Sequence, residues 1–204
     1  MSGAEADSLS TEIENSGLIT PGSGGVVLLS GGADSCALAL GLSRLNPRPT
    51  LHALHLNYGL RPESGEDEDA CSRLCERLAI GLTVVRPERA SGNLHSWARQ
   101  ERYAAAERLR RDRGLDWIAV AHTASDLAET VVYRLAVSPG TRALAAMPSR
   151  RGAVIRPLLG LSREAVRRAA TAAALPFVDD ASNDDPAFAR ARIRHEVMPV
   201  LADL

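Results

Sequence analysis

The fold of this chain is decided by the stretch Val26-Val27-Leu28-Leu29-Ser30-Gly31-Gly32-Ala33-Asp34-Ser35. Its first residues form a short apolar run that is rich in Val and Leu and follows glycine. Such a run predicts a buried strand of a parallel sheet. After the glycines and Asp34, an apolar-periodic segment that includes Cys36 and Leu38 predicts a helix. A strand, a glycine-rich turn and a helix, in this order, favour an anion-binding site.

The residues of the turn match this chemistry. Glycine lets the backbone approach a phosphate closely, and the first N–H groups of the helix have no partner within the helix. Ser30 and Ser35 add hydroxyl donors, and Asp34 is placed to hold a phosphate-bound magnesium ion. The spacing and the missing lysine exclude a Walker A loop, and the glycines do not form GxGxxG. A tight turn with Asp34 as a helix N-cap remains the alternative.

The turn also resembles the pyrophosphate-binding loop (PP-loop) of the ATP pyrophosphatases, enzymes that split ATP into AMP and pyrophosphate. The resemblance implies that ATP and Mg²⁺ are the cofactors. It implies that the nucleotide is held by Ser30, Gly31, Gly32, Ala33, Asp34 and Ser35.

Length and composition predict one α/β domain with a small appendage. The chain has 204 residues, of which 45% are hydrophobic and only 3% aromatic, so Leu, Val and Ala must form the core. The three cysteines form no CxxC pair, which favours reduced thiols and a cytoplasmic protein. No apolar run approaches the roughly 20 residues that span a bilayer, so neither a signal peptide nor a membrane anchor is expected.

Charge is distributed unevenly along a chain whose net charge is −1. Residues 1–133 carry 13 Arg against 18 acidic residues, and residues 134–204 carry 11 Arg against 7. The C-terminal third is therefore where a polyanion would bind, although a solvated surface of mixed charge explains the same counts.

The order of the patterns predicts an α/β fold with a five-stranded parallel sheet and a helical C-terminal extension. Residues 1–24 are acidic, polar and without periodicity, which predicts a disordered tail. Residues 25–160 are then expected to form the PP-loop domain, and residues 161–204 a basic helical extension that is the candidate surface for a polyanion. Strands are expected at 26–29, 51–56, 81–85, 117–121 and 154–155, and helices at 36–42, 64–79, 96–113, 124–135, 162–175 and 187–201.

Further stretches resemble one branch of the group, the tRNA(Ile)-lysidine synthetases. They are His55-Leu56-Asn57-Tyr58-Gly59-Leu60-Arg61, Ala98-Arg99 with Arg102-Tyr103, Ala121-His122 with Asp126 and Ala128-Glu129-Thr130, Ile155-Arg156-Pro157-Leu158-Leu159, Asp179-Asp180-Ala181-Ser182-Asn183, and Arg190-Ala191-Arg192-Ile193-Arg194-His195-Glu196. These motifs lie in the family's order and span residues 25–201.

The resemblance implies ATP-dependent ligation of lysine to the wobble cytidine of tRNA(Ile), through an adenylated tRNA, with release of pyrophosphate and AMP. tRNA(Ile) and free lysine are then the partners, no membrane is involved, and a homodimer is one assembly left open. It implies Asp34, Asp126 and His122 as catalytic residues, Asp34 and Asp126 as metal ligands, His55 and Asn57 as nucleotide contacts, and Arg99, Arg102, Glu129, Arg190, Arg192 and Arg194 as tRNA or lysine contacts.

From the residues alone, each of these roles has an alternative. Asp126 could be a helix N-cap, and His122 a hydrogen-bonded histidine at a strand end. His55 and Asn57 could meet the adenosine or close a turn. The arginines could belong to solvated helix faces, although those at 190, 192 and 194 lie on more than one face, which suits phosphate contact.

The chain departs from the family pattern beside the predicted site. Ser125 and Leu127 stand where the family usually has Asp and Gln, so one carboxylate and one amide are replaced. These departures favour a second hypothesis, a truncated and inactive nucleotide-binding remnant. A third, another tRNA-adenylating PP-loop enzyme such as a thiolation enzyme, ranks last because the chain lacks the cysteine pairs those enzymes usually use.

Overall fold

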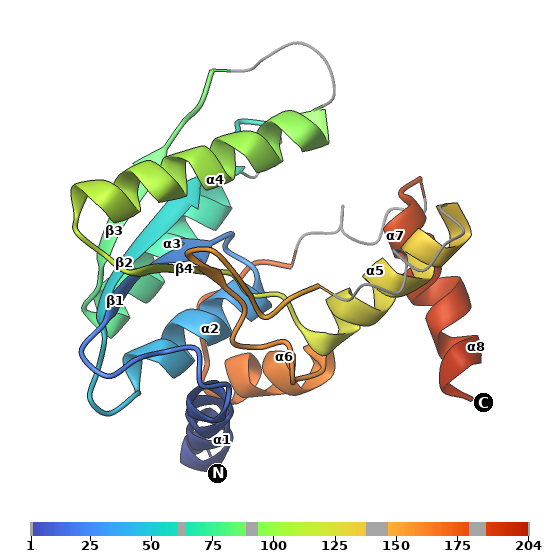
Figure 1. Ribbon diagram of the computed structural model, residues 1–204, viewed down its shortest axis with the longest axis horizontal. Helices are drawn as coiled ribbons and strands as arrows, with labels where there is room; N and C mark the ends of the chain where they lie inside the picture. Colours follow the sequence, from blue (N-terminus) through green and yellow to red (C-terminus); the bar gives the residue numbers. More distant parts are fainter. Residues whose placement is uncertain (1, 61–63, 89–93, 138–146, 180–186, 204) are drawn as a thin grey trace.

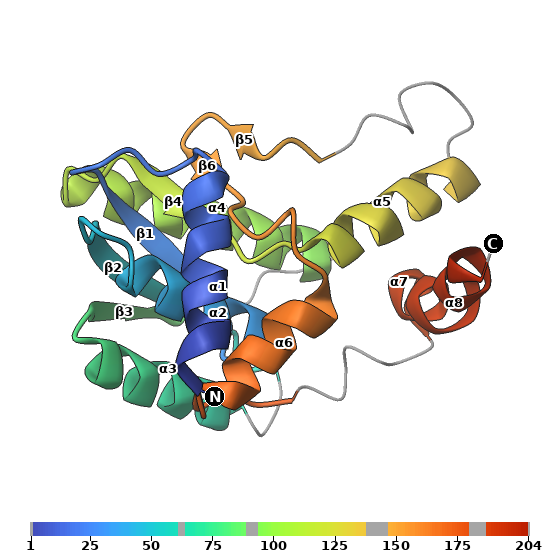
Figure 2. The same ribbon diagram turned by 90° about the horizontal axis from the view of Figure 1, so that it is seen from below.

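Six strands form one sheet in the order β3-β2-β1-β4-β6-β5; Figure 1 labels the first four along the chain, and Figure 2 also labels β5 and β6. The computed structural model describes residues 2–60, 64–88, 94–137, 147–179 and 187–203. The strands are β1 (Gly24–Leu29), β2 (Thr50–Leu56), β3 (Gly81–Val85), β4 (Trp117–Ala119), β5 (Arg150–Arg151) and β6 (Val154–Ile155). All neighbours are parallel except β5 and β6. Because β1 lies in the middle of this order, its carboxyl end is at the switch point where α/β sheets bind ligands.

Helices cover both faces of the sheet. They are α1 (Ser2–Asn15), α2 (Ala33–Ser43), α3 (Ser64–Leu78), α4 (Leu94–Asp112), α5 (Ala124–Val137), α6 (Arg163–Ala172), α7 (Ala189–Arg192) and α8 (Met198–Ala202), with a π-helical segment, Ile193–Val197, between the last two. Residues on β1 alternate between the faces, as strand geometry requires. Val26 and Leu28 pack with the α4 residues Ala105 and Ala106, whereas Val27 lies in the larger core with α1, α2, α3 and α6.

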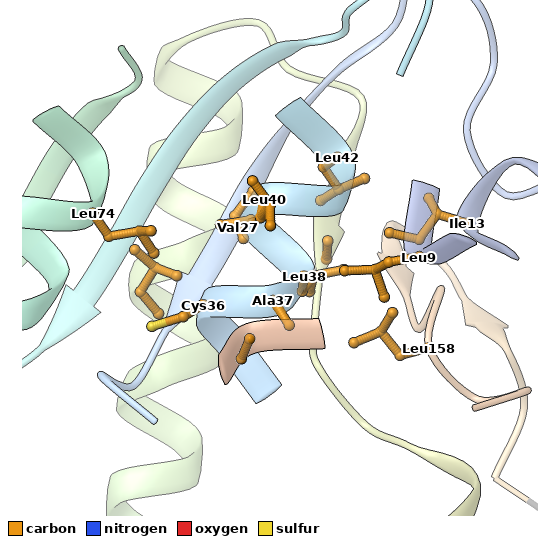
Figure 3. Close-up of a cluster of buried hydrophobic side chains, with 14 of the residues drawn as sticks. Leu9, Ile13, Val27, Cys36, Ala37, Leu38, Leu40, Leu42, Leu74 and Leu158 are labelled. Atoms are coloured by element: carbon orange, nitrogen blue, oxygen red, sulfur yellow. The ribbon is translucent and has the colours of Figure 1, made fainter. Parts of the chain in front are cut away.

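The predicted disordered tail is wrong for the described part of residues 1–24. This segment contains α1, and Leu9 and Ile13 are buried at 3% and 0% exposure against α2 (Figure 3). A Cβ on Gly41 of α2 would lie 2.5 Å from Ile13 Cδ1, so the two helices are in close contact. Two apolar residues four positions apart pack this helix against α2. The residues around them are mostly polar, so the sequence showed no clear apolar periodicity.

The predicted count of five parallel strands is also corrected to six. The extra strand, β5, pairs antiparallel to β6 through Arg150 with Ile155 and Arg151 with Val154, and Gly152 turns the chain between them at φ +59°. Both β5 residues are charged and exposed, so the strand carries no hydrophobic signal.

The predicted boundary at residue 160 divides one core. Val166, Ala169 and Ala170 of α6 are buried in the same cluster as α2, and only the later helices project away. Figures 1 and 2 show α5 extending outward from the body and α7 and α8 lying beside its far end. Among the described residues, no helix has both the length and the apolar character needed to cross a membrane.

Candidate functional site

The turn after β1 is held by its own serines. Ser35 Oγ donates to the carbonyl of Gly32 at 2.9 Å and accepts the N–H of Ser30 at 3.1 Å. The two hydroxyl oxygens, Ser30 Oγ and Ser35 Oγ, are 3.1 Å apart. The predicted loop is therefore present, and the hydroxyl groups of its two serines form hydrogen bonds within it that stabilise its backbone.

Gly31 and Gly32 have separate structural roles. Gly31 adopts φ +89°, and a Cβ there would lie 3.0 Å from both Cα and Cβ of Asp67, so neither backbone nor space admits a side chain. Gly32 is the N-cap of α2, and because it has no side chain it offers no cap to the first N–H groups of the helix. The first N–H groups of α2 are thus uncapped by a side chain, and they adjoin Asp34 in the first turn. This is the geometry that an oxyanion needs.

Arg163 brings the two predicted catalytic carboxylates together. Its Nε lies 3.9 Å from Asp34 Oδ2, and its Nη2 donates to Asp126 Oδ1 at 2.6 Å. Asp34 comes from the start of α2, Asp126 from the first turn of α5, and Arg163 from the first residue of α6. Three helix starts therefore meet at the carboxyl edge of the sheet.

Asp126 helps to cap α5 from inside the helix, but it is not the N-cap that the alternative predicted, because α5 begins at Ala124 and Thr123 precedes it. Its Oδ2 accepts the backbone N–H and the hydroxyl of Thr123, each at 2.8 Å, while the N–H of Asp126 lies 3.4 Å from Thr123 Oγ1. This reciprocal arrangement begins α5. Both carboxylate oxygens of Asp126 are therefore engaged by protein donors.

The pKa values of the two carboxylates are shifted in opposite directions. Burial, and then the charge of Asp126, raise the pKa of Asp34 to about 6, against the opposing charge of Arg163. Burial opposes ionisation of Asp126 as well, but the Thr123 hydrogen bonds and Arg163 outweigh it and hold its pKa below the usual value. Two interacting carboxylates whose pKa values are driven apart are typical of functional sites.

Glu129, one turn further along α5, is buried between two arginines. Its Oε1 accepts from Arg163 Nη1 at 2.7 Å and from Arg194 Nε at 2.8 Å, and its side chain is only 3% exposed. Burial disfavours the charged carboxylate, but the hydrogen bonds from Arg194 and Arg163 lower its pKa overall. Glu129 thereby joins the C-terminal helical segment to the central cluster.

Arg163 is the residue that the sequence analysis missed. A cation at the first position of a helix opposes the helix dipole, so local preference does not explain it. That conflict, at the start of the helix expected over 162–175, is the signal that could have identified it. Ser162 is the N-cap of α6, and its Oγ accepts the N–H of Ala165 at 3.2 Å.

His122 lies at the edge of the cluster. Its Nδ1 is buried and has no hydrogen-bond partner among the described residues. Burial lowers its pKa to about 4; Asp126 opposes this, and Arg156, Arg99 and Arg190 add to it. At neutral pH the imidazole is therefore uncharged, and the hydrogen-bonded alternative does not hold for Nδ1.

His55 and Asn57 have structural partners instead of joining this cluster. His55 is 3% exposed, and its Nδ1 lies 3.0 Å from the carbonyl oxygen of Leu29. Asn57 Nδ2 donates to Glu68 Oε2 at 2.9 Å, and Asn57 Oδ1 accepts the N–H of Gly59 at 3.0 Å. Asn57 thus closes a turn, as one of the two alternatives predicted.

The arginines predicted to contact tRNA lie in two parts of the fold, one pair on α4 and three residues in the C-terminal helical segment. Arg99, stacked 5.0 Å above the ring centroid of Tyr103, and Arg102 are exposed on α4. Arg192 is 62% exposed and lies 3.8 Å from Glu196. Arg194 is instead paired with Glu129. Arg190 Nη2 is 3.4 Å from Thr130 Oγ1, on the side of α5 that faces the C-terminal helices.

Asp34 fits a magnesium ligand better than Asp126 does. Mg²⁺ bound to phosphates needs only one or two protein carboxylates, and the side chain of Asp34 is 29% exposed beside the uncapped N–H groups. Asp126 reaches a metal only if Arg163 moves. The described residues contain no group of three or more His, Cys, Asp or Glu side chains that could hold a metal ion.

The departure at Ser125 has a structural role. Ser125 Oγ accepts the backbone N–H of Arg163 at 3.1 Å, so it joins the start of α5 to the start of α6. Leu127 is half-buried in the same turn of α5. An aspartate at position 125 would occupy the same place with a charge added.

Several curated proteins are similar to this chain over most of its length, and all three named here are tRNA(Ile)-lysidine synthases. That of Neisseria meningitidis is 38% identical over 86% of this chain, and that of Symbiobacterium thermophilum 40% over 92%. The match covers 42% and 41% of those proteins, and 56% of the Leifsonia xyli relative, so the chain spans about half of its relatives or less.

Solved structures share the fold at low identity. The U34-tRNA thiolase NcsA from Methanococcus maripaludis matches with a TM-score of 0.72 at 19% identity, covering 86% of this chain and 66% of that one. The NH3-dependent NAD synthetase from Campylobacter jejuni gives 0.53 at 17% identity, covering 85% and 72%. The PP-loop domain family model matches residues 8–201. Since that match includes nearly the whole chain and the loop at its centre has the expected form, the chain belongs to the PP-loop family of ATP-binding domains.

Proposed function

We propose that this chain carries the nucleotide-binding and ligation site of a tRNA(Ile)-lysidine synthetase. In this reaction a ring carbonyl oxygen of the wobble cytidine attacks the α-phosphorus of ATP, and pyrophosphate leaves. The ε-amine of lysine then attacks the adenylated carbon, and AMP leaves. The proposal rests on one observation above all: the PP-loop, Asp126 and Glu129 meet around Arg163 at the switch point of the sheet.

The residues of the cluster have distinct roles in this proposal. The uncapped N–H groups of α2 bind the pyrophosphate part of ATP, and Asp34 would hold a magnesium ion, which would neutralise phosphate charge. Glu129 and Asp126 hold the guanidinium of Arg163 beside the loop after β1, and their negative charge lies next to the place proposed for the lysine substrate. Neutral His122, with its unpartnered Nδ1, orients the reacting base. Lysine as the amine, a homodimer and a cytoplasmic location remain predictions.

The proposed reaction is tested by incubating the protein with labelled ATP, lysine and tRNA(Ile) and measuring AMP. We expect AMP release that requires both lysine and tRNA. No release, with ATP still bound, would favour the inactive remnant. Release that is independent of lysine would favour another adenylating enzyme. The sulfur chemistry of a thiolase is disfavoured because all three cysteines are buried, and burial raises the pKa of each thiol.

The exposed arginines of α7 should contribute to tRNA affinity. Replacing both Arg190 and Arg192 with Ala removes two exposed cations of α7 and leaves the pair between Arg194 and Glu129 in place. Each lost phosphate contact reduces the salt dependence of binding by about 0.7–0.9 log units per log unit of salt. We expect weaker binding and a slope lowered by about 1–2 units, measured by filter binding over a salt series.

A control with the same loss of charge is Arg73→Ala with Arg113→Ala, two exposed residues on α3 and after α4. This control should leave both affinity and slope nearly unchanged. If the two double variants behave alike, the contact is nonspecific or the tRNA lies elsewhere.

Restoring the family residues beside Arg163 should raise the rate. Ser125→Asp combined with Leu127→Gln adds a carboxylate at the N–H of Arg163 and an amide directly after Asp126. Because small errors in positioning can cost about a hundredfold in rate, we expect AMP formation to rise about tenfold or more. ATP affinity, measured by calorimetry, should change less because the loop after β1 carries it. An unchanged rate would mean that the two departures are neutral.

A further inference from the structure

Arg156 is a buried cation that the proposed function leaves without a role. It follows β6 directly and is only 6% exposed. Its Nη1 donates to the carbonyl of Pro148 at 2.8 Å, but its Nε has no hydrogen-bond partner, and no ion pair joins it to any carboxylate of the described residues. Burying an unpaired guanidinium costs free energy. The burial of Arg156 therefore points to an anion that is not among the described residues.

A pocket of about 300 Å³ opens against Arg156. It lies between the C-terminal end of α1 and the loop that joins β6 to α6, two segments that run side by side in Figure 2. Its volume is at the lower end of the range for small-molecule sites, about 300–1,000 Å³. The pocket is lined by none of the residues that pair around Arg163, although the charge of Arg156 also acts on His122 at the edge of that cluster.

The walls of this pocket have opposite charges and an apolar part. Arg156 is the positive side, and Glu12, near the C-terminal end of α1, is the negative side. The helix dipole adds negative potential at that end, where the last turn of α1 has no basic residue. Leu18, Leu159 and Leu161 supply apolar surface between the two charges.

We infer that this pocket binds a free α-amino acid with an apolar side chain. The planar guanidinium of Arg156 matches a carboxylate, which would at the same time neutralise the buried charge. The ammonium group would lie toward Glu12, and the side chain would pack on the leucines. An inorganic anion would satisfy Arg156 alone and would leave Glu12 as a repulsive neighbour.

Binding is tested on the whole chain by calorimetry with four probes. L-leucine is compared with 4-methylpentanoate, which lacks the ammonium group, with 3-methylbutylamine, which lacks the carboxylate, and with inorganic phosphate. We expect L-leucine to bind in about the millimolar range or tighter, and each other probe to bind about tenfold more weakly or worse. Equal binding of 4-methylpentanoate, preferential binding of phosphate, or no binding of L-leucine would each overturn the inference.

Two variants separate binding from folding. Arg156→Gln should abolish L-leucine binding, but because the residue is buried, this variant could also unfold. Glu12→Gln is at an exposed position and should weaken L-leucine about tenfold while leaving 4-methylpentanoate unchanged. Glu14→Gln, an equally exposed neighbour outside the pocket, is the matched control and should change neither. Unchanged L-leucine affinity in Glu12→Gln would overturn the inference.

Discussion

Asp34→Asn is expected to reduce AMP formation by at least about a hundredfold while leaving the protein folded and more stable. The carboxylate is the one group of the PP-loop that fits a magnesium ion, and the loss of one electrostatic contact to the reacting groups typically costs about 10²–10³ in rate. Stability should rise because the same carboxylate is partly buried and close to Asp126. A stabilising change that removes activity is typical of a functional residue.

The gain in stability should depend on pH in one direction. Burial, followed by Asp126, raises the pKa of Asp34 to about 6 in the folded protein, above its ordinary value of 3.8. The folded state therefore favours the protonated acid, and wild-type stability from this group falls as the pH rises through 6. Asn does not titrate. The free energy of unfolding of the variant should therefore be equal to or lower than that of the wild type near pH 4, and higher by about 1–3 kcal/mol above pH 6.

Urea unfolding at pH 4, 6 and 8, with AMP release measured alongside, checks both parts. Asp112→Asn, an exposed aspartate at the end of α4, is the control and should alter neither rate nor stability. If Asp34→Asn forms AMP at the parental rate, Asp34 has no role in the chemistry. A variant that is less stable at pH 8 than at pH 4, relative to wild type, would contradict the electrostatic account.

The fold was predictable from sequence where burial leaves a periodic signal. The strand after Gly24, its glycine-rich turn and the helix of Cys36 and Leu38 were all expected and are confirmed. Prediction failed for the helix and the strand that pack on the core through very few apolar residues. Leu9 and Ile13 are enough to bury one side of α1, and β5 has no apolar residue at all.

The site was predictable for residues that carry a motif and not for the residue that joins them. Asp34, Asp126 and Glu129 were expected, and the structure brings them together. Arg163, which contacts all three, carries no motif, because its partners lie 34 to 129 positions away in the sequence and only the packing of α6 brings it near. The alternative for Asp126 was wrong about the N-cap, which is Thr123, but the Asp126 carboxylate does hydrogen-bond Thr123 as well as Arg163.

Removing Glu129 is expected to destabilise the fold more than any other single change in the cluster. Glu129→Ala leaves Arg163 and Arg194 without the buried carboxylate that both contact. Loss of one partner of a buried ion pair costs about 3–5 kcal/mol, a large part of the about 5–15 kcal/mol that stabilises a typical domain. The attachment of the C-terminal helices to α5 should loosen with it, because Arg194 belongs to that segment.

A milder variant, Glu129→Gln, isolates the charge. The pKa of Glu129 is held below its ordinary value of 4.5: burial opposes ionisation, but hydrogen bonds from Arg194 and Arg163 outweigh it. An acid with a lowered pKa stabilises the fold above its unfolded pKa and loses this contribution as the pH falls through the folded value. The deficit of Glu129→Gln should therefore be complete at pH 7, begin to shrink below about pH 4.5, and vanish in stronger acid.

Glu196→Ala provides the matched comparison for both variants. Glu196 pairs with Arg192 in the same C-terminal segment, but both side chains are about 60% exposed, so its loss should cost less than about 1 kcal/mol. Urea unfolding at pH 7 and pH 3.5 measures all three proteins. If Glu129→Ala is no less stable than Glu196→Ala, or if the deficit of Glu129→Gln is the same at both pH values, the paired charges are not what joins α5, α6 and the C-terminal helices.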